Sequence, residues 1–242
     1  MISGKQTDDV SGAARPARQG PGEGEREGEE HLALDEAGEA QVAPGEAERA
    51  LEDEDEVDPQ VPPPPQVADL AAACVRFVAS RYGAALDFAP ETLSFVDHWV
   101  REARAEIAVR PEAVELVQAA AGAYLGEVVR RAFGGAWRAE GHHADWRLQL
   151  ERVYCSFNPI GMAREALLLE SADGWGAHFE LDPAEADAIE QRLAALPPAP
   201  DDEFYAPSTR FDVVAILFEA LRESLRSRGL GDVRFAPEDY TA

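Results

Sequence analysis

The sequence of 242 residues has two cysteines, one lysine and no long apolar run. Small secreted domains use several disulfide bridges, so Cys74 and Cys155, which lie far apart in the sequence, indicate two buried thiols in a reducing compartment. The longest apolar stretch, residues 119–126, has eight residues, whereas a membrane span needs about 20. The N-terminus also lacks the layout of a signal peptide. These absences predict a cytoplasmic protein without a membrane span.

Positive charge is scarce as well. The chain has 47 acidic and 22 basic residues, for a formal net charge of -25. Such a surface repels the phosphates of a nucleic acid and the headgroups of an anionic membrane. The composition therefore predicts that neither nucleic acid nor a membrane is a partner, and it favours a basic protein partner by charge complementarity.

Aromatic residues are missing from residues 1–66, which hold 18 acidic and five basic residues together with eight glycines and eight prolines. A segment of this composition cannot bury enough apolar area to offset the entropy of its chain. We therefore expect a disordered acidic tail over residues 1–66 and a single globular domain over residues 67–242. The tail either docks onto a partner or keeps the protein in solution, and the composition leaves both roles open.

Apolar residues at helical spacing, together with proline starts and glycine stops, predict six helices in the domain. The expected ranges are about 67–82, 90–108, 111–132, 159–170, 183–196 and 210–228. Asn158 and Asp182 are expected to cap the fourth and fifth helices, and Ser208 or Thr209 the sixth.

Alternating apolar and polar residues predict strands between the third and fourth helices. Residues 146–151 and 153–157 alternate in opposite phase, so a bulge or tight turn is expected at Glu151 and Arg152. Further strands are expected within 136–140, with Trp137 facing inward, and within 176–181. The predicted fold is α+β, with about six helices around a small antiparallel sheet of three to four strands.

Recognisable catalytic motifs are lacking. The sequence has no G-x-S-x-G, no P-loop and no G-x-G-x-x-G, and it implies no cofactor. His142, His143 and Asp145 form the one cluster of metal-type ligands along the chain. They are either weak metal-ligand candidates or a polar turn between strands, and a single loop with so few ligands favours the turn. We therefore assign no catalytic residue and no metal site.

The third helix carries two unusual glycines, Gly122 and Gly126. Each costs about 1 kcal/mol relative to alanine inside a helix, so their spacing of four indicates close approach of a packed neighbour. Glu127 adjoins this face. It is either a half-buried carboxylate in a cleft or half of an ion pair with Arg131 at helical spacing.

The sequence GAYLGEVVRR (122–131), followed by GGAW (134–137) and FNPIG (157–161), resembles a group of uncharacterised bacterial domains of the immunity type. The resemblance covers about residues 111–170. It implies a protein that binds a partner and performs no chemistry. The candidate binding residues within it are Tyr124, Glu127, Trp137 and Asn158.

Two functions follow as hypotheses. The first is a non-enzymatic, acidic binding or adaptor domain, immunity-like, that masks a basic protein partner. The second is a small-molecule enzyme that uses carboxylates or histidines in a cleft beside the sheet. Convergence of Glu127, His143 and Asp145 in a cleft favours the enzyme, whereas an acidic face with exposed aromatic residues favours the binder.

Overall fold

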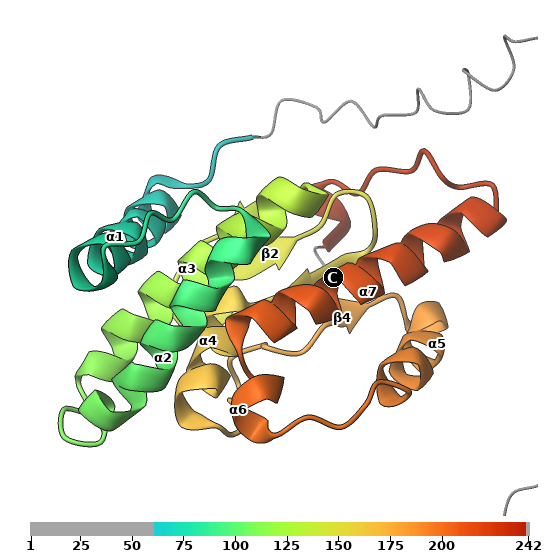
Figure 1. Ribbon diagram of the computed structural model, residues 1–242. Coiled ribbons are helices and arrows are strands. Elements are labelled where there is room, and N and C mark those ends of the chain that lie inside the picture. The colour runs from blue at the N-terminus through green and yellow to red at the C-terminus, as the bar shows by residue number, and fades with distance from the viewer. Residues whose placement is uncertain (1–60, 241–242) are drawn as a thin grey trace, which may run out of the picture. The chain divides into compact units, whose positions relative to one another are not determined.

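The computed structural model describes residues 61–240, and all but the last six residues of the predicted tail (1–66) lie outside the described residues. The described chain is α+β, as predicted, with seven α-helices and one four-stranded antiparallel sheet (Figure 1). The helices are α1 (Pro65–Tyr82), α2 (Leu93–Ile107), α3 (Ala113–Phe133), α4 (Pro159–Leu168), α5 (Pro183–Ala194), α6 (Asp201–Phe204) and α7 (Pro207–Ser227). Within residues 61–240, no helix is both long and apolar enough to cross a bilayer.

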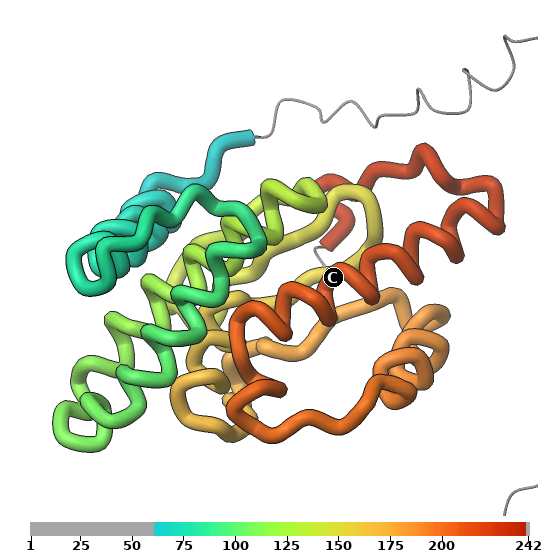
Figure 2. The backbone as a smooth tube through the Cα atoms, viewed as in Figure 1, coloured from blue at the N-terminus to red at the C-terminus, as the bar shows by residue number. Residues whose placement is uncertain are grey.

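The first three helices follow the predicted boundaries closely because their signals are local. Helix α1 ends at Gly83, whose left-handed φ of 69° allows the glycine N–H to bond the carbonyl of Ala79. Helix α3 ends at Gly134, which also has a positive φ. Pro90 begins a short 3-10 turn that leads into α2. Figure 2 shows α2 and α3 running beside one another, with α1 packed along them.

Helix α3 forms the centre of the domain and packs against α1 on one side and α4 on another. A Cβ atom at Gly122 would lie 2.7 Å from the carbonyl oxygen of Pro159, and one at Gly126 would overlap the ring of Trp137. The expectation that these glycines permit close packing is confirmed. The neighbours are the first turn of α4 and the first strand of the sheet.

The sheet has the order β1-β2-β3-β4, with β1 (Ala136–Arg138), β2 (Arg147–Gln149), β3 (Cys155–Phe157) and β4 (Glu180–Leu181). Register pairs Trp137 with Leu148 and Leu148 with Phe157, so three large apolar residues lie side by side in the core. The strands are shorter than predicted. In particular, the expected strand 176–181 is reduced to two residues, because Gly176 has a left-handed φ of 59° and its carbonyl accepts the N–H of Asn158.

The C-terminal part differs most from the prediction. The four-residue helix α6 was not predicted, and α7 begins at Pro207 after a cap at Ala206 whose side chain makes no capping bond. The predicted cap at Ser208 or Thr209 is therefore wrong. Helix α7 begins earlier than predicted because Pro207 suits its first turn, and the Ser208 hydroxyl instead donates to Asp97 of α2 at 2.5 Å. By contrast, the side chains of Asn158 and Asp182 cap α4 and α5 as predicted.

Candidate functional site

Glu127 lies in the interior, where only 1% of its surface is exposed. Its two carboxylate oxygens accept Nε and Nη2 of Arg130 at 2.8 and 2.9 Å, and Oε1 also accepts Nε1 of Trp137 at 2.9 Å. The expected partner Arg131 lies farther away, at 3.8 Å. Both oxygens are engaged with buried donors, so the carboxylate stabilises the contact between α3 and β1.

Tyr124 is fully buried one turn earlier on α3. Its hydroxyl accepts the N–H of Phe88 at 2.9 Å and bonds the hydroxyl of Thr92 at 2.6 Å. Because the Thr92 proton is directed to the carbonyl of Ala89, Tyr124 is the donor in that pair. Burial raises the pKa of Tyr124 above its ordinary value. The residue thus anchors the loop between α1 and α2.

Asn158 is also fully buried, and it joins two segments. Its side-chain oxygen accepts the N–H of Ile160 at 2.9 Å and thereby caps α4, while its Nδ2 donates to the carbonyls of His143 and Ala144 at 2.8 and 3.2 Å. The amide therefore fixes the loop after β1 against the start of α4.

That loop contains His142, His143 and Asp145, which the structure places in a 3-10 turn. The two imidazole rings face different neighbours, since His142 packs edge-on against Trp175 and His143 against Trp146. Burial lowers the pKa of His143. Across residues 61–240, no three histidine, cysteine or acidic residues are grouped to hold a metal ion.

The four candidate binding residues are thus distributed over the interior, whereas the weak metal candidates His142 and Asp145 are exposed. The structure brings Glu127 together with Trp137, and Asn158 together with the backbone of the histidine loop, whereas Tyr124 bonds elsewhere. Glu127 is saturated by its own partners, so the cleft that the enzyme hypothesis requires is not built around it. A surface that recognises a partner must therefore be formed by residues other than these buried candidates.

Such a surface lies between α5, α6 and the first turns of α7. We call it the α5–α7 groove, and it has a volume of about 570 Å³. Its walls are mainly apolar and include Phe179, Leu193, Leu196, Phe204, Tyr205 and Val213. Leu196 and Phe204 are among the few large apolar side chains with substantial exposure, at 38% and 43%.

One wall of the groove is held by Arg210 of α7. Its Nη2 donates to Glu165 of α4 at 2.8 Å, and its guanidinium lies 4.5 Å from the ring centre of Phe204 and 5.1 Å from that of Tyr205. Burial lowers the pKa of Arg210, and the charge of Glu165 opposes that shift. Together these contacts fix α6 against α7.

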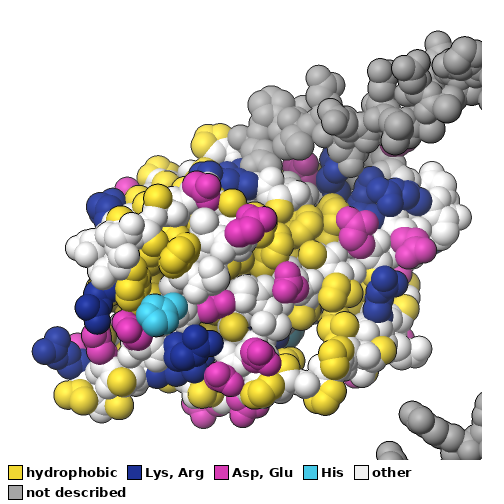
Figure 3. All heavy atoms as spheres, viewed as in Figure 1, with side chains coloured by type: hydrophobic (Ala, Val, Ile, Leu, Met, Phe, Trp, Pro, Cys, Tyr) yellow, Lys and Arg dark blue, Asp and Glu magenta, His cyan; other side chains and the backbone are white. Residues whose placement is uncertain are grey.

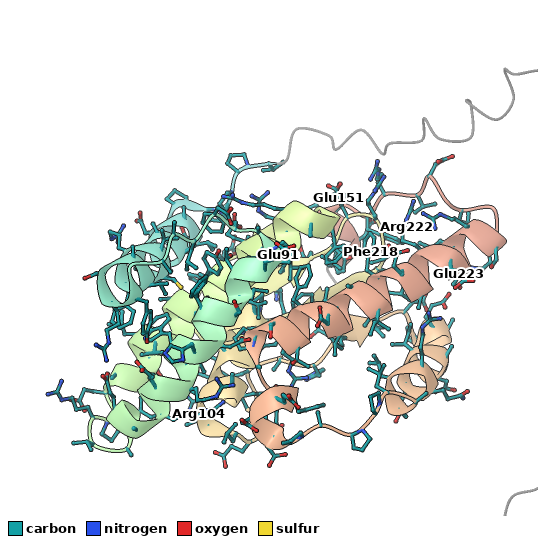
Figure 4. The ribbon with its side chains drawn as sticks, in the orientation of Figure 1. Glu91, Arg104, Glu151, Phe218, Arg222 and Glu223 are labelled. Carbon is teal, nitrogen blue, oxygen red and sulfur yellow. The ribbon has the colours of Figure 1, made fainter. Side chains whose placement is uncertain are left out.

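Asp97 of α2 holds the same corner from a third side. Its carboxylate accepts the backbone N–H of Ser208 at 3.0 Å as well as the Ser208 hydroxyl. Burial raises the pKa of Asp97, and the two bonds from Ser208 oppose that shift. Arg104, also on α2, donates Nε and Nη2 to the carbonyl of Ala166 and so ties α2 to the end of α4 (Figure 4).

The stretch of chain that contributes α5 and α6 to the groove is strongly acidic, and Asp201 lines the groove itself. Residues 170–206 contain ten acidic residues and one basic residue, Arg192. Nine of the carboxylates are on exposed residues, and we call this surface the acidic face: Glu170, Asp173, Glu180, Asp182, Asp187, Glu190, Asp201, Asp202 and Glu203. Arg192 lies 4.0 Å from Glu223 of α7, which Figure 4 labels. Figure 3 shows acidic and apolar side chains next to each other along the lower edge of the molecule.

The sequence carried a signal for this site that motif analysis missed. The charge of the domain is distributed unevenly along the sequence. Residues 170–206 contain ten acidic residues and one arginine, whereas the rest of residues 61–240 contains nineteen acidic and sixteen basic residues. The same stretch contains two apolar residues around Pro197 and Pro198, namely Leu196, which continues the stripe of α5, and Phe204.

The chain was also compared with protein-family models, with curated proteins and with solved structures. None of the three comparisons found a match.

Proposed function

We propose that the domain is a binding or adaptor module that covers a basic protein partner with its acidic face. The observation that carries this proposal is the segregation of charge. Residues 170–206 have a formal charge of -9, out of -12 for residues 61–240. Surfaces of one sign attract partners of the opposite sign, raise the rate of encounter and reject partners of like charge.

The organisation of the interior supports a binding role. The most buried carboxylate, Glu127, is neutralised by Arg130 and bonded to Trp137, and Glu165 is paired with Arg210. Nine exposed carboxylates instead lie within residues 170–206, and one of them, Asp201, lines the apolar groove. An immunity-like role, in which the acidic face masks a basic surface of a second protein, agrees with this arrangement and with the resemblance of residues 111–170.

The test compares two variants with the same change in net charge. The first is Asp187→Asn, Glu190→Gln, Asp201→Asn and Asp202→Asn on the acidic face. The control is Glu91→Gln, Glu106→Gln, Glu112→Gln and Glu115→Gln, all exposed on the other helices. The probe is a fluorescent lysine-rich peptide, titrated against each full-length protein at low and at physiological salt.

We expect the acidic-face variant to bind the peptide about tenfold or more weakly and the control to bind within about twofold of the parent protein, because the local field governs the encounter. Equal weakening of binding in the two variants would mean that only net charge matters. No binding by the parent protein at low salt would reject the proposed function itself.

A further inference from the structure

We propose that the α5–α7 groove receives an amphipathic segment of the partner, with an apolar side chain inserted into the groove and basic side chains on the rim. This inference rests on the proposed function and specifies how the partner is recognised. It assigns the binding energy to Leu196, Phe204 and their apolar neighbours, and the selection of a cationic partner to the carboxylates around them.

The first support is the incomplete burial of α5. Its apolar side chains Ile189 and Leu193, continued by Leu196, lie on the side of the helix that faces α7. Of these, Ile189 is buried, whereas Leu193 is only half-buried and Leu196 is exposed. A helix that packs its whole apolar stripe onto a core leaves no such remainder, so this stripe has surface available for another chain.

The second support is that the groove is formed before any partner arrives. Glu165 and Asp97 hold the start of α7 from α4 and α2, and the guanidinium of Arg210 lies against the rings of Phe204 and Tyr205. Pro197 and Pro198 restrict the backbone conformation of the connection between α5 and α6, because a proline ring fixes φ. A preformed groove binds more tightly because little conformational entropy is lost on binding.

The third support is the charge of the rim, which defines the chemistry of the occupant. Asp201 lines the groove, and Asp202 and Glu203 follow it on α6. The arginine that lines the groove, Arg210, is mostly buried and paired with Glu165. An anionic occupant would meet repulsion from the rim, whereas a segment with lysine or arginine beside an apolar anchor matches both features.

The shape of the groove fits the helix-in-groove mode of recognition. An amphipathic helix presents apolar residues at i, i+3, i+4 and i+7 and basic residues beside them. A volume of about 570 Å³ accommodates anchor side chains of such a stripe. The apolar anchor is expected to contact Leu193 of α5 and Phe204 of α6, which both line the groove.

The experiment uses the full-length protein and two synthetic peptides of equal length and charge. One has leucines at helical spacing with lysines elsewhere, and the other has serine in place of each leucine. Binding is measured by fluorescence anisotropy for the parent, for Leu196→Ser, and for the double variant Leu196→Ser with Phe204→Ser. The matched control is Leu116→Ser with Phe95→Ser, which removes two exposed apolar side chains elsewhere.

We expect the leucine peptide to bind the parent at least about tenfold more tightly than the serine peptide. Leu196→Ser should remove part of that difference, the double variant most of it, and the control none. The effect of Leu196→Ser alone is measured as well, because Phe204 also contacts Arg210 and its replacement changes that contact too. Urea unfolding of each variant verifies that the domain remains folded.

Two outcomes would overturn the inference in different ways. If both peptides bind the parent equally, or if the groove and control variants weaken binding equally, the acidic face acts without an apolar anchor, and the groove proposal fails while the proposed function stands. If neither peptide binds at low salt, both proposals fail together.

Discussion

Two regions of the domain use their apolar residues in opposite ways. Around α3 and α4, small residues allow close contact of backbones, and each carboxylate in the interior has buried partners. Around α5 and α6, apolar side chains stay exposed and carboxylates surround them. The first region stabilises the fold, whereas the second leaves apolar surface available for binding a partner.

Glu127→Ala should destabilise the domain by about 3–5 kcal/mol, because it leaves Arg130 buried without its carboxylate and Trp137 Nε1 without its acceptor. The measurement is the free energy of unfolding in urea. The control is Glu102→Ala, which removes a half-exposed carboxylate 3.6 Å from Arg81 and should cost less than about 1 kcal/mol. Similar losses for both variants would contradict the structural role assigned to Glu127.

The same substitution in the two regions gives a direct comparison. Leu125→Ala, at a fully buried position of α3, should lower the free energy of unfolding by about 2–5 kcal/mol. Leu196→Ala, at the exposed edge of the α5–α7 groove, should lower it by less than about 1 kcal/mol. A loss at Leu196 as large as that at Leu125 would show that the groove belongs to the core.

Gly122→Ala should destabilise the domain by about 1–3 kcal/mol, although alanine favours a helix, because its Cβ would collide with the backbone of Pro159 and Ile160. Gly126→Ala should destabilise the domain as well, since its Cβ would overlap the buried ring of Trp137, which is held by its bond to Glu127. Gly231→Ala is the matched control, because its nearest neighbour lies at an ordinary 3.4 Å. A more stable Gly122→Ala would refute the close-packing account.

Ser208→Ala should raise the pKa of Asp97 further above its ordinary value, because the hydroxyl of Ser208 stabilises the ionised carboxylate. The raised pKa of Asp97 in the parent means that stability falls as the pH rises through that pKa, since the folded state then holds the proton more tightly. The loss caused by Ser208→Ala should therefore be larger above the pKa of Asp97 than below it, since a neutral carboxyl accepts a weaker hydrogen bond than a carboxylate. A carboxyl NMR titration of both proteins measures the shift, and an unchanged pKa would exclude this contact.

The local parts of the fold were predictable because their signals lie within a few residues. The boundaries of α1, α2 and α3 follow from apolar periodicity and terminal glycines, and the caps at Asn158 and Asp182 follow from residue type. Helix α6 was missed because four residues carry no periodicity. The cap at Ser208 was assigned wrongly because α7 begins at Pro207, and the hydroxyl of Ser208 instead donates to Asp97, which is 111 residues away in the sequence.

The candidate site divides in the same way. The sequence alone determined the α+β class, the need for close packing at Gly122 and Gly126, and the surplus of negative charge, because composition and spacing are properties of the chain itself. Only the tertiary structure decided that Glu127 is bonded to Trp137 and that Leu196 and Phe204 border one groove. These relations depend on how helices distant in sequence pack together, and no local pattern encodes the distance between them.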